Sequence, residues 1–101
     1  MLLLIRTEGS IQVQLGIAVL VTVAGFWFDL SLLEWCIQLL AIGLVMGVEG
    51  LNTALEKLAD YIQPEHDQRI GLIKDIAAGA VFITALVAAI VGLLIYLPKL
   101  F

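Results

Sequence analysis

Apolar and polar positions lie in long blocks along the chain, and the blocks predict helices. Apolar segments cover residues 11–28, 32–48 and 76–97. The second segment continues after Val48 as a more polar helical stretch, so its predicted helix is residues 32–58. Ile76 to Leu97 contains no charged residue. At about 1.5 Å per residue, a helix of this length is long enough to cross a hydrocarbon core of roughly 30 Å. A soluble bundle would need polar faces at helical spacing, which this segment lacks. We therefore predict an all-α integral membrane protein with three transmembrane helices.

Two connections separate the three segments. The first, over residues 29–31, is predicted to be a tight hairpin, because Ser31 and Glu34 match a capping box at the start of the second helix. The second, over residues 61–74, contains Pro64 and is mostly polar, so it is expected to lie in water. The chain should have one sizeable polar loop.

Composition supports a single membrane domain over residues 1–101. Apolar residues make up 62% of the chain and charged residues only 14%, which lies outside the range of soluble globular domains. Cys36 is the single cysteine, which excludes an intramolecular disulfide and a zinc site built on cysteine pairs. The chain has no Walker loop and no glycine-rich kinase loop, so the familiar soluble nucleotide-binding folds are disfavoured. No nucleic-acid partner is expected.

Basic residues are distributed unevenly between the two sides of the predicted bundle. Only Lys99 lies on the hairpin side, where Trp27 and Trp35 also flank the interface, a common position for tryptophan without a catalytic role. The remaining basic residues lie on the side of the N-terminus and the long loop: Arg6, Lys57, Arg69 and Lys74. The positive-inside rule places this second side in the cytoplasm, where ATP and magnesium are available.

The second helix carries an acidic stripe, which we define as Glu49, Asn52, Glu56 and Asp60. At about 100° per residue these four positions fall within roughly 80° of one helix face. Carboxylates at membrane depth cost a few kcal/mol each, so they normally face a cavity, a protein interior or a cation. Oxygen ligands of this kind suit magnesium bound to phosphates. Two alternatives stay open: Glu56 and Asn52 could be a hydrogen-bonded pair between helices, and Glu49 could be a structural carboxyl rather than a general base.

Other polar residues could complete such a site. Glu8 precedes the first span and could reach the same rim, although alone it is an ordinary surface acid. Lys74 and Asp75 open the third helix, where a lysine can offset phosphate charge or can simply anchor the helix at the interface. Gln12 and Gln14 lie near the entry to the first span and could meet a polar lipid headgroup.

The sequence Glu49-Gly-Leu-Asn52-Thr-Ala-Leu-Glu56-Lys-Leu-Ala-Asp60, followed by Lys74-Asp75-Ile-Ala-Ala-Gly-Ala, resembles the bacterial diacylglycerol kinase family. That family also includes undecaprenol kinases. The likeness extends from about Arg6 to the C-terminus. It implies a homotrimer of three-span subunits in the bacterial inner membrane, with sites between subunits that face the cytoplasm. These sites would transfer the γ-phosphoryl group of MgATP to a lipid hydroxyl.

The resemblance also implies roles for individual residues. Glu49 would be the catalytic base, and Glu8 with Glu56 would hold Mg²⁺. The residues implied to contact ATP are Glu8, Asn52, Glu56, Glu65, His66, Asp67, Lys74 and Asp75. The residues implied to contact the lipid are Ser10, Gln12, Gln14, Trp27, Trp35, Glu49 and Ala78.

These observations predict an ATP-dependent lipid kinase, with diacylglycerol as the named substrate and undecaprenol as the close alternative. A rival of another class is a cation-translocating or structural membrane subunit, in which the acids relay ions or join helices. That rival predicts acids spaced through the bilayer. Residues 37–48 and 76–97 contain none, and the acids crowd one end of the second helix.

Overall fold

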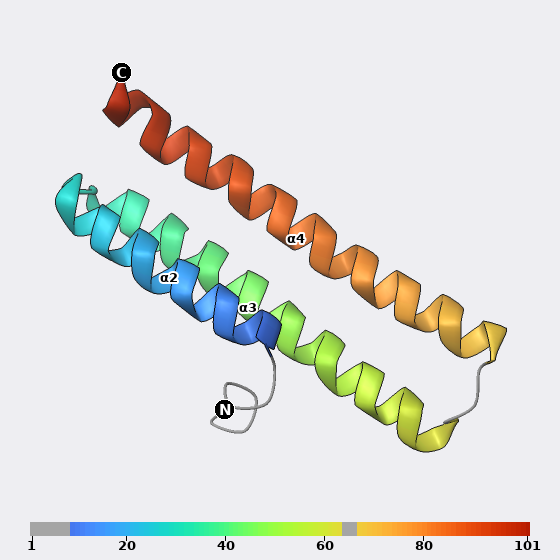
Figure 1. The fold of residues 1–101 in the computed structure, drawn as a ribbon. Helices are drawn as coiled ribbons and strands as arrows, with labels where there is room; N and C mark the ends of the chain where they lie inside the picture. The colour runs from blue at the N-terminus through green and yellow to red at the C-terminus, as the bar shows by residue number, and fades with distance from the viewer. Residues whose placement is uncertain (1–8, 64–66) are drawn as a thin grey trace.

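The computed structural model describes residues 9–63 and 67–101, which form three helices (Figure 1). They are α2 (Gly9–Trp27), α3 (Leu32–Ile62) and α4 (Gln68–Leu100). Both α2 and α4 run antiparallel to α3, and α2 lies only along its first half (Figure 1). The molecule is elongated, with extents of 51 × 25 × 18 Å. The prediction of an all-α chain is confirmed.

The hairpin between α2 and α3 forms as the sequence predicts. Asp29 adopts a φ of 56°, and the Leu30 amide donates a hydrogen bond to the Gly25 carbonyl at 3.1 Å. The Ser31 hydroxyl accepts from the Glu34 amide at 3.2 Å, and the Glu34 carboxylate accepts from the Ser31 amide at 2.9 Å. This reciprocal pair is the predicted capping box, and it satisfies two amides that the first turn of a helix leaves unpaired.

The second connection is shorter than the loop predicted over residues 61–74. Helix α3 continues to Ile62 and α4 already begins at Gln68, so most of that stretch is helical. The Asp67 side chain explains the early start of α4, because it accepts a hydrogen bond from the Arg69 amide at 2.8 Å and caps the helix. At 31 and 33 residues, α3 and α4 are each more than about 45 Å long, which exceeds a hydrocarbon core of roughly 30 Å. Polar ends of both helices can therefore extend beyond the bilayer.

Apolar side chains cover most of the described surface. Only four apolar residues in the described ranges are buried, namely Ile11, Leu30, Ala59 and Ile95, whereas large residues such as Phe82 are exposed. Such a surface suits a lipid environment rather than water. Helices α3 and α4 are each long and apolar enough to cross a membrane, and the apolar part of α2, Ile11–Trp27, is shorter. These features are those of a helical membrane protein. That α2 forms a third transmembrane span stays a prediction.

A polar contact joins all three helices near the hairpin end. The buried Gln38 of α3 donates from Nε2 to the Val21 carbonyl of α2 at 3.2 Å. The Tyr96 hydroxyl of α4 lies 2.5 Å from Gln38 Oε1 and 3.0 Å from the same carbonyl. Glu34 and Lys99 form an ion pair at 3.1 Å at this end. We call Gln38, Tyr96 and the Val21 carbonyl the three-helix lock.

Loss of the three-helix lock should measurably destabilise the fold. Tyr96→Phe removes the hydroxyl but keeps the ring, and we expect a cost of about 1 kcal/mol in the free energy of unfolding in detergent. Tyr61→Phe is the matched control, because the Tyr61 side chain lies on the surface at 87% exposure. Equal unfolding midpoints for the two variants would show that the lock does not stabilise the bundle.

Candidate functional site

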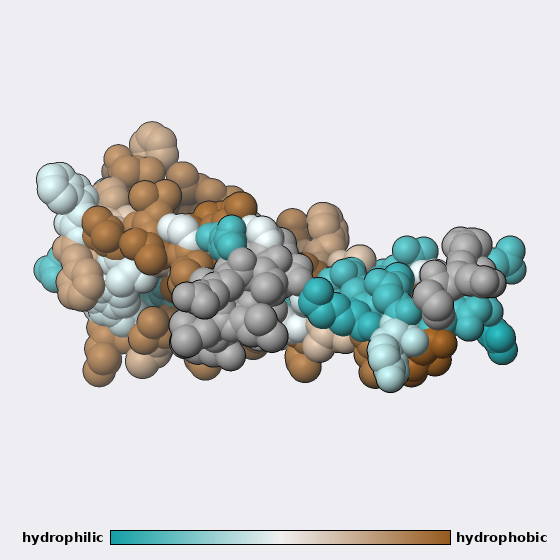
Figure 2. Space-filling view, turned by 60° about the horizontal axis from the view of Figure 1, so that its bottom comes forward, coloured by the Kyte–Doolittle hydropathy of each residue, from teal (hydrophilic) through white to brown (hydrophobic). Residues whose placement is uncertain are grey.

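The acidic stripe lies on the half of α3 that α2 does not cover. Its residues are three, four and four positions apart, so their side chains share one helix face. This face leads to the polar end of the bundle, formed by the last turns of α3 and the first turns of α4. Figure 2 shows hydrophilic surface gathered toward this end and hydrophobic surface over the hairpin end. The structure thus places the predicted stripe on the half of α3 that leads to the hydrophilic end of the molecule.

Within the stripe, Asn52 and Glu56 are linked. Asn52 Nδ2 donates a hydrogen bond to Glu56 Oε1 at 3.2 Å, one turn along the same helix. Within one chain the pair is thus formed along α3, and a contact of either side chain with another helix stays an open alternative. The Glu56 side chain is exposed and Glu49 is half-buried. The contact uses the nitrogen of the Asn52 amide as a donor, so the amide oxygen remains without a hydrogen bond from Glu56.

Asn52 Oδ1 is buried and has no hydrogen-bond partner in the described part of the chain. An unsatisfied buried oxygen is unusual in a folded protein and favours a ligand that would satisfy it. The nitrogen of the same amide is bonded to the Glu56 carboxylate, and the two side chains together carry hard oxygen ligands of the type that Mg²⁺ prefers. Residues 9–63 and 67–101 contain no group of three or more acidic, histidine or cysteine side chains close enough to hold a metal ion. A metal here would need further oxygens, which phosphates can supply.

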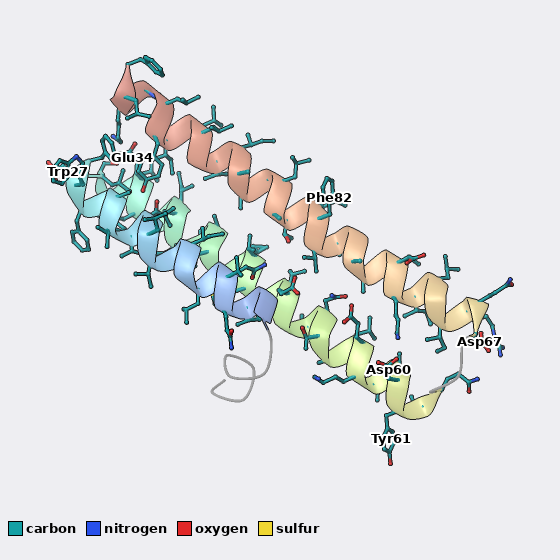
Figure 3. The ribbon with its side chains drawn as sticks, in the orientation of Figure 1. Trp27, Glu34, Asp60, Tyr61, Asp67 and Phe82 are labelled. Carbon is teal, nitrogen blue, oxygen red and sulfur yellow. The ribbon has the colours of Figure 1, made fainter. Side chains whose placement is uncertain are left out.

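Helix α4 brings a cation to the stripe. Lys74 Nζ lies 2.5 Å from Asp60 Oδ1, across the seam between α4 and α3. Figure 3 shows Asp60 on the side of α3 that faces α4, whereas Tyr61 points away from the bundle. Asp75 follows Lys74 and is exposed. The Asp60 carboxylate and the Lys74 ammonium group therefore meet at the polar end.

The other residues predicted to contact ATP are placed less directly. Glu8, Glu65 and His66 lie outside the described residues. Asp67 lies at the start of α4 (Figure 3), where it caps the helix and forms an ion pair with Arg69 at 3.4 Å. Its position at the polar end is compatible with a nucleotide contact.

The residues predicted to contact lipid fall into two groups. Gln14 borders an apolar cavity of about 430 Å³ between the three helices, and Gln14 Oε1 is buried without a hydrogen-bond partner in the described part of the chain. Gln12 and Ala78 are exposed, and the side chain of Ser10 lies outside the described residues. The cavity extends from Gln14 toward the three-helix lock. Gln14 is thus one of the polar side chains that line the cavity, together with Gln38 and Tyr96.

Trp27 and Trp35 are not brought to the acidic stripe. Trp27 lies at the hairpin end of the bundle, opposite Asp60 (Figure 3), and its side chain is 84% exposed. Trp35 packs against Phe26 with ring centroids 4.9 Å apart, and a Cβ atom on Gly25 would lie 2.6 Å from its Cη2. Trp35 thus fills the space that Gly25 leaves in the hairpin.

The residues of the three-helix lock were not predicted from the sequence, although a glutamine inside an apolar helix was an available signal.

Comparison with known proteins adds an independent observation. The family model described as prokaryotic diacylglycerol kinase matches residues 1–96. The undecaprenol kinase of Bacillus subtilis (strain 168) is 44% identical over 95 residues, which is 94% of this chain and 77% of that protein. The diacylglycerol kinase of Escherichia coli (strain K12) is 37% identical over 78 residues, 76% of this chain and 64% of that protein.

A third relative, the diacylglycerol kinase of Synechocystis sp. (strain ATCC 27184 / PCC 6803 / Kazusa), is 34% identical over 95 residues, 93% of this chain and 54% of that protein. The match to the family model, over residues 1–96, includes both the acidic stripe and Lys74. The resemblance seen in the sequence is confirmed, and with it the prediction of a lipid kinase. The chain belongs to the prokaryotic diacylglycerol kinase family of membrane lipid kinases.

Proposed function

We propose that this chain transfers the γ-phosphoryl group of ATP to undecaprenol, with diacylglycerol as the alternative acceptor. The observation that carries the proposal is the meeting of the acidic stripe and Lys74 at one polar end of an otherwise apolar bundle. Diacylglycerol, which the sequence predicts first, takes second place. The undecaprenol kinase shares 44% of positions over 95 residues, against 37% over 78 for the Escherichia coli diacylglycerol kinase.

Magnesium fits the oxygens at this site. Glu56 would hold the ion together with Glu8, and the unsatisfied Asn52 oxygen supports them. When bound, Mg²⁺ neutralises charge on the phosphates of ATP and orients them for in-line transfer. Lys74 offsets further phosphate charge from the α4 side, and Asp67 and Asp75, with Glu65 and His66, complete the nucleotide contacts.

Glu49 serves as the base in this proposal. The Glu49 carboxylate accepts the proton of the lipid hydroxyl while that oxygen forms a bond to the γ-phosphorus. The bond between the γ-phosphorus and the bridging oxygen to the β-phosphate breaks, and ADP leaves with the electron pair. Glu49 lies about 10 Å from Glu56 along the helix axis, at 1.5 Å per residue, so the base and the metal ligand can flank one transferring group. The deeper position of Glu49 suits an acceptor that arrives from the bilayer.

Gln14 fits the acceptor side of the same reaction. Its unsatisfied oxygen can accept a hydrogen bond from the lipid hydroxyl when the lipid binds, before that proton passes to Glu49, and the apolar cavity behind it can receive the adjacent hydrocarbon. Gln14→Leu should raise KM for the lipid about tenfold, because one hydrogen bond is lost, and should leave KM for ATP unchanged. Gln68→Leu, an exposed position on α4, is the matched control. Equal lipid KM values for the two variants would remove Gln14 from the acceptor site.

The assembly and location also belong to the proposal. We infer a homotrimer in the bacterial inner membrane, with sites between subunits that face the cytoplasm. The exposed apolar helix faces and the incomplete set of metal ligands within the described ranges of one chain support this inference. The mass of the detergent-solubilised complex, measured by light scattering with the detergent contribution subtracted, tests the oligomer number.

The activity is tested by phosphate transfer in mixed micelles. The purified chain is supplied with MgATP labelled in the γ-phosphate and with undecaprenol or diacylglycerol in separate reactions. We expect label in the lipid fraction with both acceptors and a higher kcat/KM with undecaprenol. A higher kcat/KM with diacylglycerol would reverse the order of the acceptors, and absence of label with both would contradict the kinase assignment.

A further inference from the structure

The ion pair between Lys74 and Asp60 links two helices at the point where the nucleotide phosphates are proposed to bind. Lys74 Nζ and Asp60 Oδ1 are 2.5 Å apart although the residues are 14 positions apart in the chain. Two further ion pairs are seen in the described ranges. Arg69–Asp67 is local to one turn, and Lys99–Glu34 lies at the hairpin end. Asp60 therefore holds the ammonium group that α4 presents at the polar end.

The contact fixes where that ammonium group lies relative to the rest of the stripe. Asp60 follows Glu56 by four residues, so the two side chains lie one above the other on the same face of α3. Lys74 Nζ is consequently held about one helical turn beyond Glu56 along the axis of α3. Phosphates bound through Glu56 that extend toward the end of the bundle would reach this position. Without Asp60, the lysine stem has four rotatable bonds and no fixed direction.

Stability is a weak explanation for this pair. The Lys74 and Asp60 side chains are 35% and 63% exposed, and ion pairs at such exposure contribute little to the free energy of folding. Asp60 also adds a negative charge to a stripe that already contains Glu49 and Glu56, which is unfavourable unless the cation it holds is needed there. The placement of Lys74 is the larger effect of the contact.

We propose that Asp60 is a positioning residue that orients Lys74 toward the phosphates of ATP. The proposal rests on the kinase function proposed above. Asp60 is not predicted to contact ATP, metal or lipid, and it acts only through Lys74. The ammonium group is thus pre-organised by a carboxylate of the neighbouring helix, which reduces the conformational freedom lost when the nucleotide binds.

A double-mutant cycle on ATP affinity tests this proposal. Asp60→Asn should raise KM for ATP about five- to tenfold, with a smaller change in kcat, because the misplaced ammonium weakens phosphate binding. In the Lys74→Met background the same substitution should change KM for ATP less than about twofold. Asp60→Glu, which keeps the carboxylate, should recover part of the affinity. Asp29→Asn, an exposed acid at the hairpin end, is the matched control.

Binding measured without turnover separates this inference from the proposed function. The affinity for MgADP, measured by calorimetry in detergent, should follow the same pattern across the four chains of the cycle. An equal effect of Asp60→Asn in both backgrounds would contradict the proposal, and so would a rise in nucleotide affinity, which would mean that Asp60 competes with phosphate for Lys74. Failure of the kinase assignment would appear differently, as absence of lipid phosphorylation by the unsubstituted chain.

Discussion

Replacing Glu56 by glutamine should reduce kcat at least about a thousandfold, because removal of a charged metal ligand removes charge neutralisation in the transition state. Glutamine has nearly the same shape as glutamate, and its side-chain oxygen can still accept the hydrogen bond from Asn52 Nδ2. The fold should therefore persist, and a thermal midpoint close to that of the unsubstituted chain would verify this. The measurement is transfer of labelled phosphate to undecaprenol at saturating lipid.

The Mg²⁺ dependence of the Glu56→Gln variant makes the test specific. A weakened metal site should require a higher Mg²⁺ concentration for half-maximal activity, whereas a general structural defect should leave that concentration unchanged. Asp29→Asn removes one carboxylate at the opposite end of the molecule and controls for the change in net charge. Activity of Glu56→Gln within a few-fold of the control would show that Glu56 is not a metal ligand.

Glu49→Gln should produce the second large effect, a fall in kcat of about 10² to 10⁴-fold that is typical of losing a general base. KM for ATP and the Mg²⁺ requirement should stay near their original values, because Glu49 is assigned to the lipid hydroxyl rather than to the nucleotide. The two variants are thus expected to differ in kind: Glu56→Gln loses metal binding and Glu49→Gln loses chemistry.

Nucleotide binding by the inactive Glu49→Gln chain completes that comparison. Calorimetry with MgADP should give the same affinity as for the unsubstituted chain. Loss of MgADP affinity in Glu49→Gln together with retention in Glu56→Gln would exchange the two assigned roles. Full activity of Glu49→Gln would show that this carboxyl is structural, which is the alternative that the sequence leaves open.

Much of the fold follows from local rules that the sequence displays directly. The capping box at Ser31 and Glu34 forms as predicted, because its two hydrogen bonds involve residues only three positions apart. The long apolar blocks predict the helices, but the helices do not begin and end where the apolar blocks do. Asp67 starts α4 before the apolar segment begins, since a cap depends on one side chain and not on hydrophobicity.

Contacts between helices were harder to predict than the helices themselves. The pattern places Asp60 on the acidic stripe, but nothing local indicates that Lys74 of another helix meets it, because helix crossing and register are set by packing across the whole seam. The three-helix lock at Gln38 is a further case. The packing of Trp35 over Gly25 could not be predicted either, and a lipid contact of Trp35 stays a prediction from the resemblance.

The distribution of acids also separates the kinase from its rival. A cation path would need ionisable groups along the bundle interior, but the cavity between the helices is lined by apolar residues with Gln14, Gln38 and Tyr96 as its polar members. The stripe lies instead on the second half of α3, and its last residue, Asp60, contacts the ammonium group of Lys74 on α4. This arrangement supports a site for a phosphorylated ligand at the membrane surface.

Phosphate transfer by the purified chain decides whether it is a lipid kinase. With γ-labelled MgATP and undecaprenol in mixed micelles, we expect label in the lipid fraction that depends on Mg²⁺, with the transfer nearly lost in Glu56→Gln. Absence of labelled lipid with undecaprenol and with diacylglycerol, from a chain that is folded and binds MgADP, would contradict the kinase assignment.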